Sequence, residues 1–138
     1  MRVEKKLSAN DLGHTGSHQA GIHVPKDERI LNFFPLLNGR TKNPRAHIVM
    51  REVADNTRWD FNFIYYNNRL SGGTRNEYRL TCMTGYLRAV GASVGDVLTF
   101  RKDKDGSIFI TIDRQSPAKL SEDGSTLVLS GGWRVINF

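Results

Sequence analysis

The chain has 138 residues, which suffices for one domain with its own core, and its apolar fraction of 38% argues against disorder. Lysine and arginine total 20 against 14 aspartate and glutamate, and the net charge of +6 fits nucleic acid or an anionic membrane surface without selecting either. No apolar run approaches the roughly 18 residues that span a bilayer, and the charged N-terminus does not resemble a signal peptide, so we expect no membrane partner. The single cysteine, Cys82, excludes an internal disulfide and fits the reducing cytoplasm.

The first third of the chain predicts short strands, one long polar segment and a short helix. A first strand precedes residues 5–21, which are rich in glycine, serine, asparagine and histidine and predict a structured loop. Residues 20–24 predict a strand that ends at Pro25, because proline cannot donate to a strand ladder. Residues 26–34 carry acids near their start and then apolar residues, which predicts a short helix ended by Pro35.

The rest of the chain alternates between turn residues and runs rich in β-branched and aromatic residues, which is typical of short strands. Strands are predicted at 45–53, 58–66, 77–82, 97–102, 107–112, 127–129 and 133–138, and a second short helix at 85–90. Regular turns between so many short strands favour a small, mainly antiparallel barrel over a sandwich.

The segment between two of these strands, residues 65–79, is too long for a tight hairpin, which needs only about two turn residues. It contains three arginines, three asparagines, a glutamate, a threonine and a glycine pair. Arginine can bond the guanine edge, asparagine the adenine edge, and glutamate can accept a hydrogen bond from cytosine. The segment therefore predicts contacts to DNA bases, the alternative being a solvated surface loop.

We call residues 5–21 the first arm and residues 65–79 the second arm. If both project from the same face of the barrel, they form a basic cleft about as wide as the DNA major groove, roughly 12 Å. Asp11 and Glu77 are acids in this basic setting. Each either accepts a hydrogen bond from cytosine or braces a neighbouring arginine, and the sequence leaves both roles open.

The sequence contains no recognisable catalytic motif. Its only Glu-x-Lys, Glu4–Lys6, has no preceding acid that would complete a nuclease-type metal site, and it has neither a phosphate-binding loop nor a nucleophile elbow. Histidines 14, 18 and 23 lie four and five residues apart, but zinc sites usually add cysteine or acidic ligands, and only Asp11 is close in sequence. These histidines are DNA contacts, polar loop residues or, in a metal-dependent barrel enzyme, metal ligands.

The two arms resemble the N-terminal DNA-binding (effector) domain of EcoRII-type restriction endonucleases. The matching motifs are KLSAND at 6–11 with TGSHQAG at 15–21, and IYYNNR at 64–69 with TRNEYR at 74–79. The resemblance implies a mainly β fold, an open pseudobarrel of about seven or eight mostly antiparallel strands with two short helices, shared with plant transcription-factor domains. Residues 1–138 would form one such domain, at the N-terminal end of a longer enzyme.

The resemblance also implies a function, which is sequence-specific recognition of duplex DNA at a CC(A/T)GG-type site without catalysis by this domain. Cleavage, with its Mg²⁺, would belong to a separate C-terminal nuclease domain, so we expect this domain to need no cofactor. We further expect a monomer in a prokaryotic cytoplasm. A transcription regulator with the same fold and a protein-binding barrel are the other interpretations.

The predicted DNA contacts combine the polar residues of both arms with the positions that the resemblance implies. They are Lys5, Lys6, Ser8, Asn10, Asp11, His14, His18 and His23 in or beside the first arm, and Arg69, Thr74, Arg75, Asn76, Glu77, Tyr78 and Arg79 in the second arm. Bases would be chosen by Asp11, Arg75, Glu77 and Arg79, and phosphates held by Lys5, Lys6 and Arg69. The sequence departs from the family at Gly73 and Tyr78, where the family has basic residues, and at His23, where it has an aromatic residue.

Overall fold

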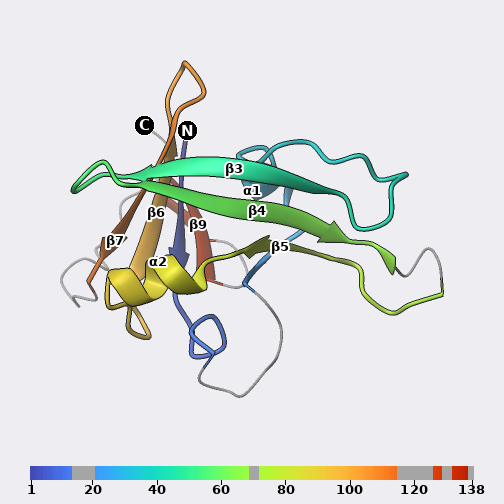
Figure 1. Cartoon of the computed structure of the whole chain (residues 1–138), viewed down its shortest axis with the longest axis horizontal. Coiled ribbons are helices and arrows are strands. Elements are labelled where there is room, and N and C mark those ends of the chain that lie inside the picture. Colours follow the sequence, from blue (N-terminus) through green and yellow to red (C-terminus); the bar gives the residue numbers. More distant parts are fainter. Residues whose placement is uncertain (14–20, 69–71, 115–125, 129–131, 137–138) are drawn as a thin grey trace.

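The computed structural model describes residues 1–13, 21–68, 72–114, 126–128 and 132–136 of the chain (Figure 1). These residues form one nine-stranded sheet with two short helices. The strands are β1 (Arg2–Lys6), β2 (Ile22–Val24), β3 (Arg45–Glu52), β4 (Arg58–Tyr66), β5 (Glu77–Thr81), β6 (Val97–Lys102), β7 (Ile108–Asp113), β8 (Thr126–Val128) and β9 (Trp133–Ile136). The helices are α1 (Glu28–Leu31) and α2 (Thr84–Ala89).

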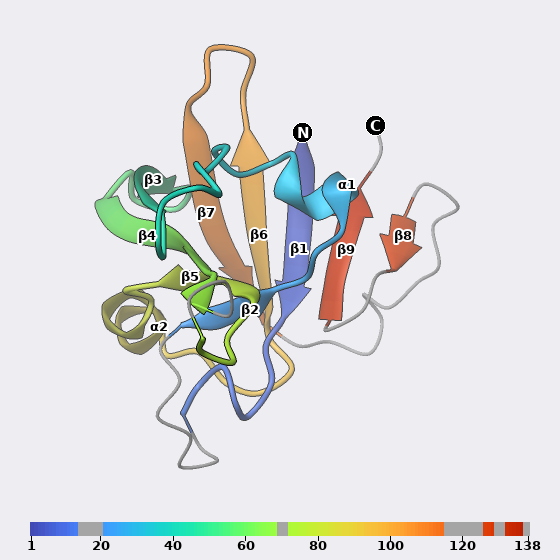
Figure 2. The ribbon, with the colours of Figure 1, turned by 90° about the vertical axis from the view of Figure 1, so that its right-hand side faces the viewer.

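The strands follow the order β2-β5-β4-β3-β7-β6-β1-β9-β8, and every neighbouring pair is antiparallel except β3 and β7, which are parallel. Figure 2 shows that the sheet is strongly curled, with β2 and β8 as its two edges. The predicted mainly β, open pseudobarrel is therefore confirmed. The described strands number nine, and their bounds lie within two residues of those predicted from the sequence.

Aromatic residues of the core gather around Trp133, which is fully buried. Its ring stacks on Phe100 with centroids 5.8 Å apart and meets the edge of Phe34 at 6.2 Å, and Phe34 in turn stacks on Phe63 at 4.6 Å. Its indole nitrogen donates to the carbonyl oxygen of His23 at 3.0 Å. Trp133 thus connects β9 to β2, although these strands are not neighbours in the sheet. The bond holds β2 in place, and β2 carries His23, a residue of the candidate site.

Helix α1 supplies part of this core. Asp27 caps it by accepting a hydrogen bond from the backbone N–H of Arg29 at 2.9 Å, and Ile30 is its buried residue. The helix is shorter than the predicted 26–34, because the chain leaves it at Asn32 and turns Phe33 and Phe34 into the core.

A buried carboxylate joins β3, β7 and α2. Glu52 is 7% exposed and accepts hydrogen bonds from the Tyr86 hydroxyl at 3.0 Å and from the Thr111 hydroxyl at 3.4 Å. Burial and the neighbouring Glu52 carboxylate raise the pKa of Tyr86 well above its usual value, so the phenol stays protonated and keeps donating.

We predict that Tyr86→Phe lowers the free energy of unfolding by about 1–3 kcal/mol, because it leaves a buried carboxylate short of a donor. Urea denaturation of the variant and the parent protein measures this difference. Tyr66→Phe is the matched control, with an expected change within about 0.5 kcal/mol, because the Tyr66 hydroxyl makes no hydrogen bond among the described residues. Equal effects of the two substitutions would contradict the role assigned to the buried pair.

Candidate nucleic-acid interface

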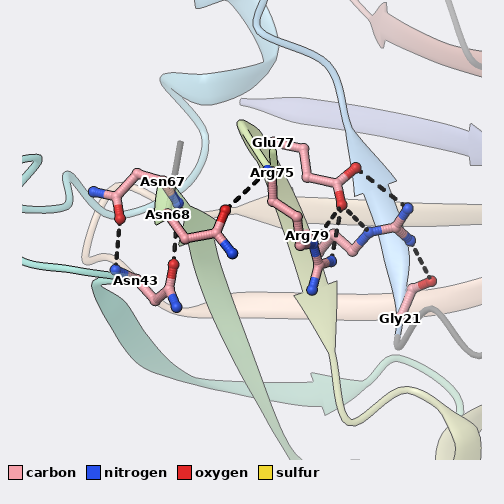
Figure 3. Close-up of polar contacts among 7 residues, drawn as sticks. All are labelled: Gly21, Asn43, Asn67, Asn68, Arg75, Glu77 and Arg79. Atoms are coloured by element: carbon pink, nitrogen blue, oxygen red, sulfur yellow. Dashed lines mark hydrogen bonds and ion pairs between the residues drawn. The ribbon is translucent and has the colours of Figure 1, made fainter. Parts of the chain in front are cut away.

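Three charged side chains of the second arm form one connected cluster, which Figure 3 shows. Arg75, Glu77 and Arg79 alternate along the chain into β5, so their side chains share one face. The Glu77 carboxylate accepts from Arg75 Nη2 at 2.8 Å and Nε at 3.2 Å, and from Arg79 Nε at 3.3 Å and Nη2 at 3.4 Å. Arg79 Nη1 also donates to the carbonyl oxygen of Gly21 at 3.4 Å. One carboxylate therefore orients both guanidinium groups and joins the second arm to the residue that precedes β2.

The electrostatics of the cluster keep Glu77 ionised. Its partial burial alone would raise the pKa of the carboxyl group, but the hydrogen bonds from Arg75 and Arg79 outweigh that effect and lower the pKa below its usual value near 4.5. At neutral pH the cluster thus holds two cations and one anion, a net charge of +1.

Arg75 and Arg79 differ in the solvent exposure of their side chains. The Arg75 side chain is 36% exposed, and its guanidinium lies over the ring of Tyr66, 3.7 Å from the ring centroid. The Arg79 side chain is 4% exposed. Arg75 therefore presents a fixed, accessible guanidinium, whereas Arg79 serves as an internal support.

Asparagine side chains fix both ends of the loop that carries Arg75. At its start, Asn67 and Asn43 exchange backbone-to-side-chain hydrogen bonds of 2.7 and 3.1 Å, and Asn67 is only 3% exposed (Figure 3). At its end, the Asn68 side chain accepts from the Arg75 N–H at 2.8 Å, while the Asn68 carbonyl accepts from the Gly73 N–H at 2.8 Å. A Cβ atom at Gly73 would lie 2.7 Å from Asn68 Cγ, so a side chain at this position would require the Asn68 side chain to move.

The first arm begins with a turn that is closed by its own side chains. The Ser8 N–H donates to Asp11 Oδ2 at 2.8 Å, and the Asp11 N–H donates to the Ser8 hydroxyl at 3.2 Å. The same carboxylate forms an ion pair with Lys5 Nζ at 3.2 Å, and both side chains are less than 10% exposed. Asp11 therefore braces a lysine, and the neighbouring Lys6 and Asn10 are exposed.

His23 on β2 lies between the two charged clusters. It pairs with Arg79 in the β2–β5 ladder and lines a hollow together with Lys5, Lys6 and Asp11. Burial and then the charge of Arg79 lower the pKa of His23 below its usual 6.5, partly opposed by Glu77. The imidazole is therefore neutral at pH 7 and can accept as well as donate a hydrogen bond.

The remaining predicted contacts differ in their surroundings. Thr74 is exposed, whereas Asn76 accepts a hydrogen bond from the Tyr65 hydroxyl at 2.5 Å. Tyr78 points to the other face of β5, where its ring stacks on Tyr65 with centroids 4.4 Å apart. Predicted contacts outside the described residues are His14, His18 and Arg69.

Two other predictions bear on the same surface. Among the described residues, no three histidine, cysteine, aspartate or glutamate side chains gather in a way that could hold a metal ion, while the metal interpretation of His14 and His18 falls outside them. No helix in the described part of the chain is long and apolar enough to cross a membrane.

Comparisons with known proteins agree with the resemblance seen in the arms. The model of the family described as restriction endonuclease EcoRII, N-terminal, matches residues 2–112. The type II restriction enzyme EcoRII of Escherichia coli is 37% identical over an alignment of 112 residues, and the match covers 74% of this chain and 26% of that enzyme. The chain thus spans about a quarter of the length of this relative.

Two solved structures share the fold. In a complex of Arabidopsis FUS3 with DNA, the protein matches with a TM-score of 0.64 and 21% identity, over 82% of this chain and 96% of that one. The B3 domain of the UbaLAI restriction endonuclease, solved with its cognate DNA, matches with a TM-score of 0.54 and 20% identity, over 85% of this chain and 69% of that one.

We predict that Glu77→Gln lowers the free energy of unfolding by about 1–3 kcal/mol at pH 7, because it leaves the buried Arg79 without its carboxylate. Since the pKa of Glu77 is lowered in the folded state, its contribution is present above pH 4.5 and is lost as the pH falls through the folded pKa. Urea denaturation at pH 7 and near pH 3 should therefore show a larger difference between variant and parent at pH 7 than near pH 3.

Asp103→Asn is the matched control, because the Asp103 carboxylate pairs with Arg101 while both side chains are nearly half exposed. We expect it to change stability by less than about 1 kcal/mol. An effect of Glu77→Gln that is the same at both pH values would contradict the pKa argument.

Proposed function

The chain belongs to the family of EcoRII N-terminal domains, and from this membership and the geometry of its arms we propose that it recognises duplex DNA in a sequence-specific way. The two arms would enter the major groove from either side of β2. The target would be a CC(A/T)GG-type site, as the family resemblance implies. The DNA complexes of the two structural neighbours support duplex DNA as the partner.

The observation that carries this proposal is the presence of a braced acid in each arm. A surface that only attracts phosphates is favoured by as many unopposed cations as possible. Here Asp11 and Glu77 cancel part of the positive charge and in return fix the positions of Lys5, Arg75 and Arg79. Fixed side chains serve base recognition, because a bidentate arginine–guanine pair depends on orientation.

The roles of individual residues follow from exposure. Arg75 would donate its guanidinium to a guanine edge, and Lys6, which is exposed, would hold a phosphate. Lys5 and Arg79, which the sequence suggests as direct contacts, are buried and would act as positioning residues instead. His23, neutral and between the arms, would bond a base edge.

In the whole protein this domain would act as the DNA-binding part of a type II restriction endonuclease. We propose that it does not cleave DNA by itself and that a nuclease domain of the same polypeptide carries out the Mg²⁺-dependent step. The domain would need no cofactor and would bind as a monomer in the cytoplasm of a prokaryote.

A competition experiment tests the proposal. Labelled duplex with a CC(A/T)GG site is challenged by unlabelled random duplex and by a copy altered at one guanine. We expect a preference for the site of about 10³-fold or more at physiological salt, largely lost in the altered copy. Equal competition by all three duplexes would contradict sequence-specific recognition.

Substitution of Arg75 tests its role as a base reader. We predict that Arg75→Ala weakens binding to the specific site by about 1–3 kcal/mol, and changes binding to random duplex much less. Arg58→Ala is the control, because Arg58 is an exposed arginine that also pairs with an acid, Asp60. Equal losses on specific and random duplex would assign Arg75 to phosphate binding.

A further inference from the structure

A third loop lies against the second arm and carries unopposed positive charge. It comprises residues 39–44, which precede β3, together with Arg45, the first residue of β3, and we call it the clasp loop. In Figure 1 the clasp loop and the second arm extend together at the right-hand end of the molecule. Neither the sequence motifs nor the family resemblance points to it.

Hydrogen bonds hold the clasp loop to the base of the second arm. Besides the paired bonds between Asn43 and Asn67, the Asn67 side-chain amide donates to the carbonyl oxygens of Thr41 at 2.8 Å and Gly39 at 3.3 Å. The Tyr65 N–H donates to the Pro44 carbonyl at 3.0 Å. Asn43 adopts a left-handed backbone conformation with φ of 49°, which asparagine tolerates better than most residues. The loop is therefore a fixed neighbour of the arm.

The cations of the clasp loop differ from most other surface arginines. Across the described residues, the side chains of Arg40, Lys42 and Arg45 form no ion pair, and all three are exposed. By contrast, exposed Arg29, Arg58 and Arg101 each pair with an acid.

The surrounding sequence reinforces this charge. No aspartate or glutamate occurs between Glu28 and Glu52. Beside the same arm, exposed Lys26 places its ammonium 5.7 Å from the centre of the Tyr65 ring. The chain between Glu28 and Glu52 therefore contributes no acidic side chain beside the second arm, unlike the braced clusters of the two arms.

We propose that the clasp loop is a third DNA contact, in which Arg40, Lys42 and Arg45 bind phosphates of the duplex held by the second arm. This inference rests on the proposed DNA-binding function and extends it to a surface outside the two arms. Exposed cations without acidic partners suit phosphate oxygens, which carry no sequence information but fix the register of the protein on DNA. The hydrogen bonds to Asn67 would keep these cations at a constant distance from Arg75, so that phosphate and base contacts reinforce each other.

The test is the salt dependence of binding by the double variant Arg40→Ala/Lys42→Ala. Each lost phosphate contact reduces the slope of log affinity against log salt by about 0.9, so we expect a slope smaller by about two. Affinity near 0.1 M salt should fall at least tenfold, and by the same factor for specific and random duplex. A thermal melt confirms that the variant is folded.

Arg101→Ala/Lys104→Ala is the matched control, because it removes the same two charges near the β6–β7 turn, at the end of the sheet opposite the first arm (Figure 1). We expect it to change the slope by less than about half a unit. The proposal would be overturned if the clasp-loop variant kept the slope of the parent protein. It would also be overturned if the control variant lost as much slope as the clasp-loop variant.

The experiment also separates this inference from the proposed function. If the parent protein prefers its site while the clasp-loop variant keeps the parental slope, the third contact is wrong and base recognition stands. If the parent shows no site preference but the variant loses slope, the third contact stands and base recognition is wrong. If the parent binds no duplex, both are wrong.

Discussion

The candidate interface depends on the ion pairs that Glu77 makes with Arg75 and Arg79. Through Arg79 and the Gly21 carbonyl, this carboxylate connects the second arm to the end of the first, although 55 residues separate Gly21 from Glu77 in the sequence. Gly21 itself has no room for a side chain, because a Cβ atom there would lie 2.1 Å from the Leu80 carbonyl oxygen. The last residue of the first arm and the end of the second arm are thus both anchored at the same short strand pair, β2 and β5.

The acids in the two arms lower the positive charge of the arms and at the same time fix the positions of neighbouring cations. The arms give up part of their attraction for phosphates, since each holds an acid, and gain side chains that already have a defined orientation before DNA binds. The clasp loop has the opposite character, with cations that are exposed and unopposed among the described residues. Together they would combine a rigid reading surface with a sequence-independent source of affinity, a division of labour common to DNA-binding proteins.

The sequence predicts the fold well because most of its information is local. Alternating runs such as those of β4 and β6 have the strand period, and turn residues mark their ends, so their bounds are found without any knowledge of tertiary contacts. The composition of the arms likewise identifies both candidate contact segments. The family resemblance is a sequence-level finding that the comparisons confirm, whereas the contacts of the arms stay a prediction.

The sequence cannot show which polar and charged residues are buried or already bonded within the protein. The burial of Lys5 and Arg79, and the bonds between Asn43 and Asn67, depend on residues brought together by the sheet. A local pattern gives the same signal for an exposed and a buried arginine, so Arg75 and Arg79 look equivalent until the fold separates them. Gly73 is similar, since its close approach to the Asn68 side chain is visible only in the folded structure.

The most direct test of the whole account is an NMR titration of the ¹⁵N-labelled protein with a CC(A/T)GG duplex, in which the amide chemical shifts are monitored. The account predicts that shift changes concentrate in residues 6–13, 21–24, 39–45 and 72–79, on one side of the barrel, and that the β6–β7 turn stays unchanged. Shift changes centred on that turn, or no changes at stoichiometric duplex, would contradict the assignment of the arms as the DNA interface.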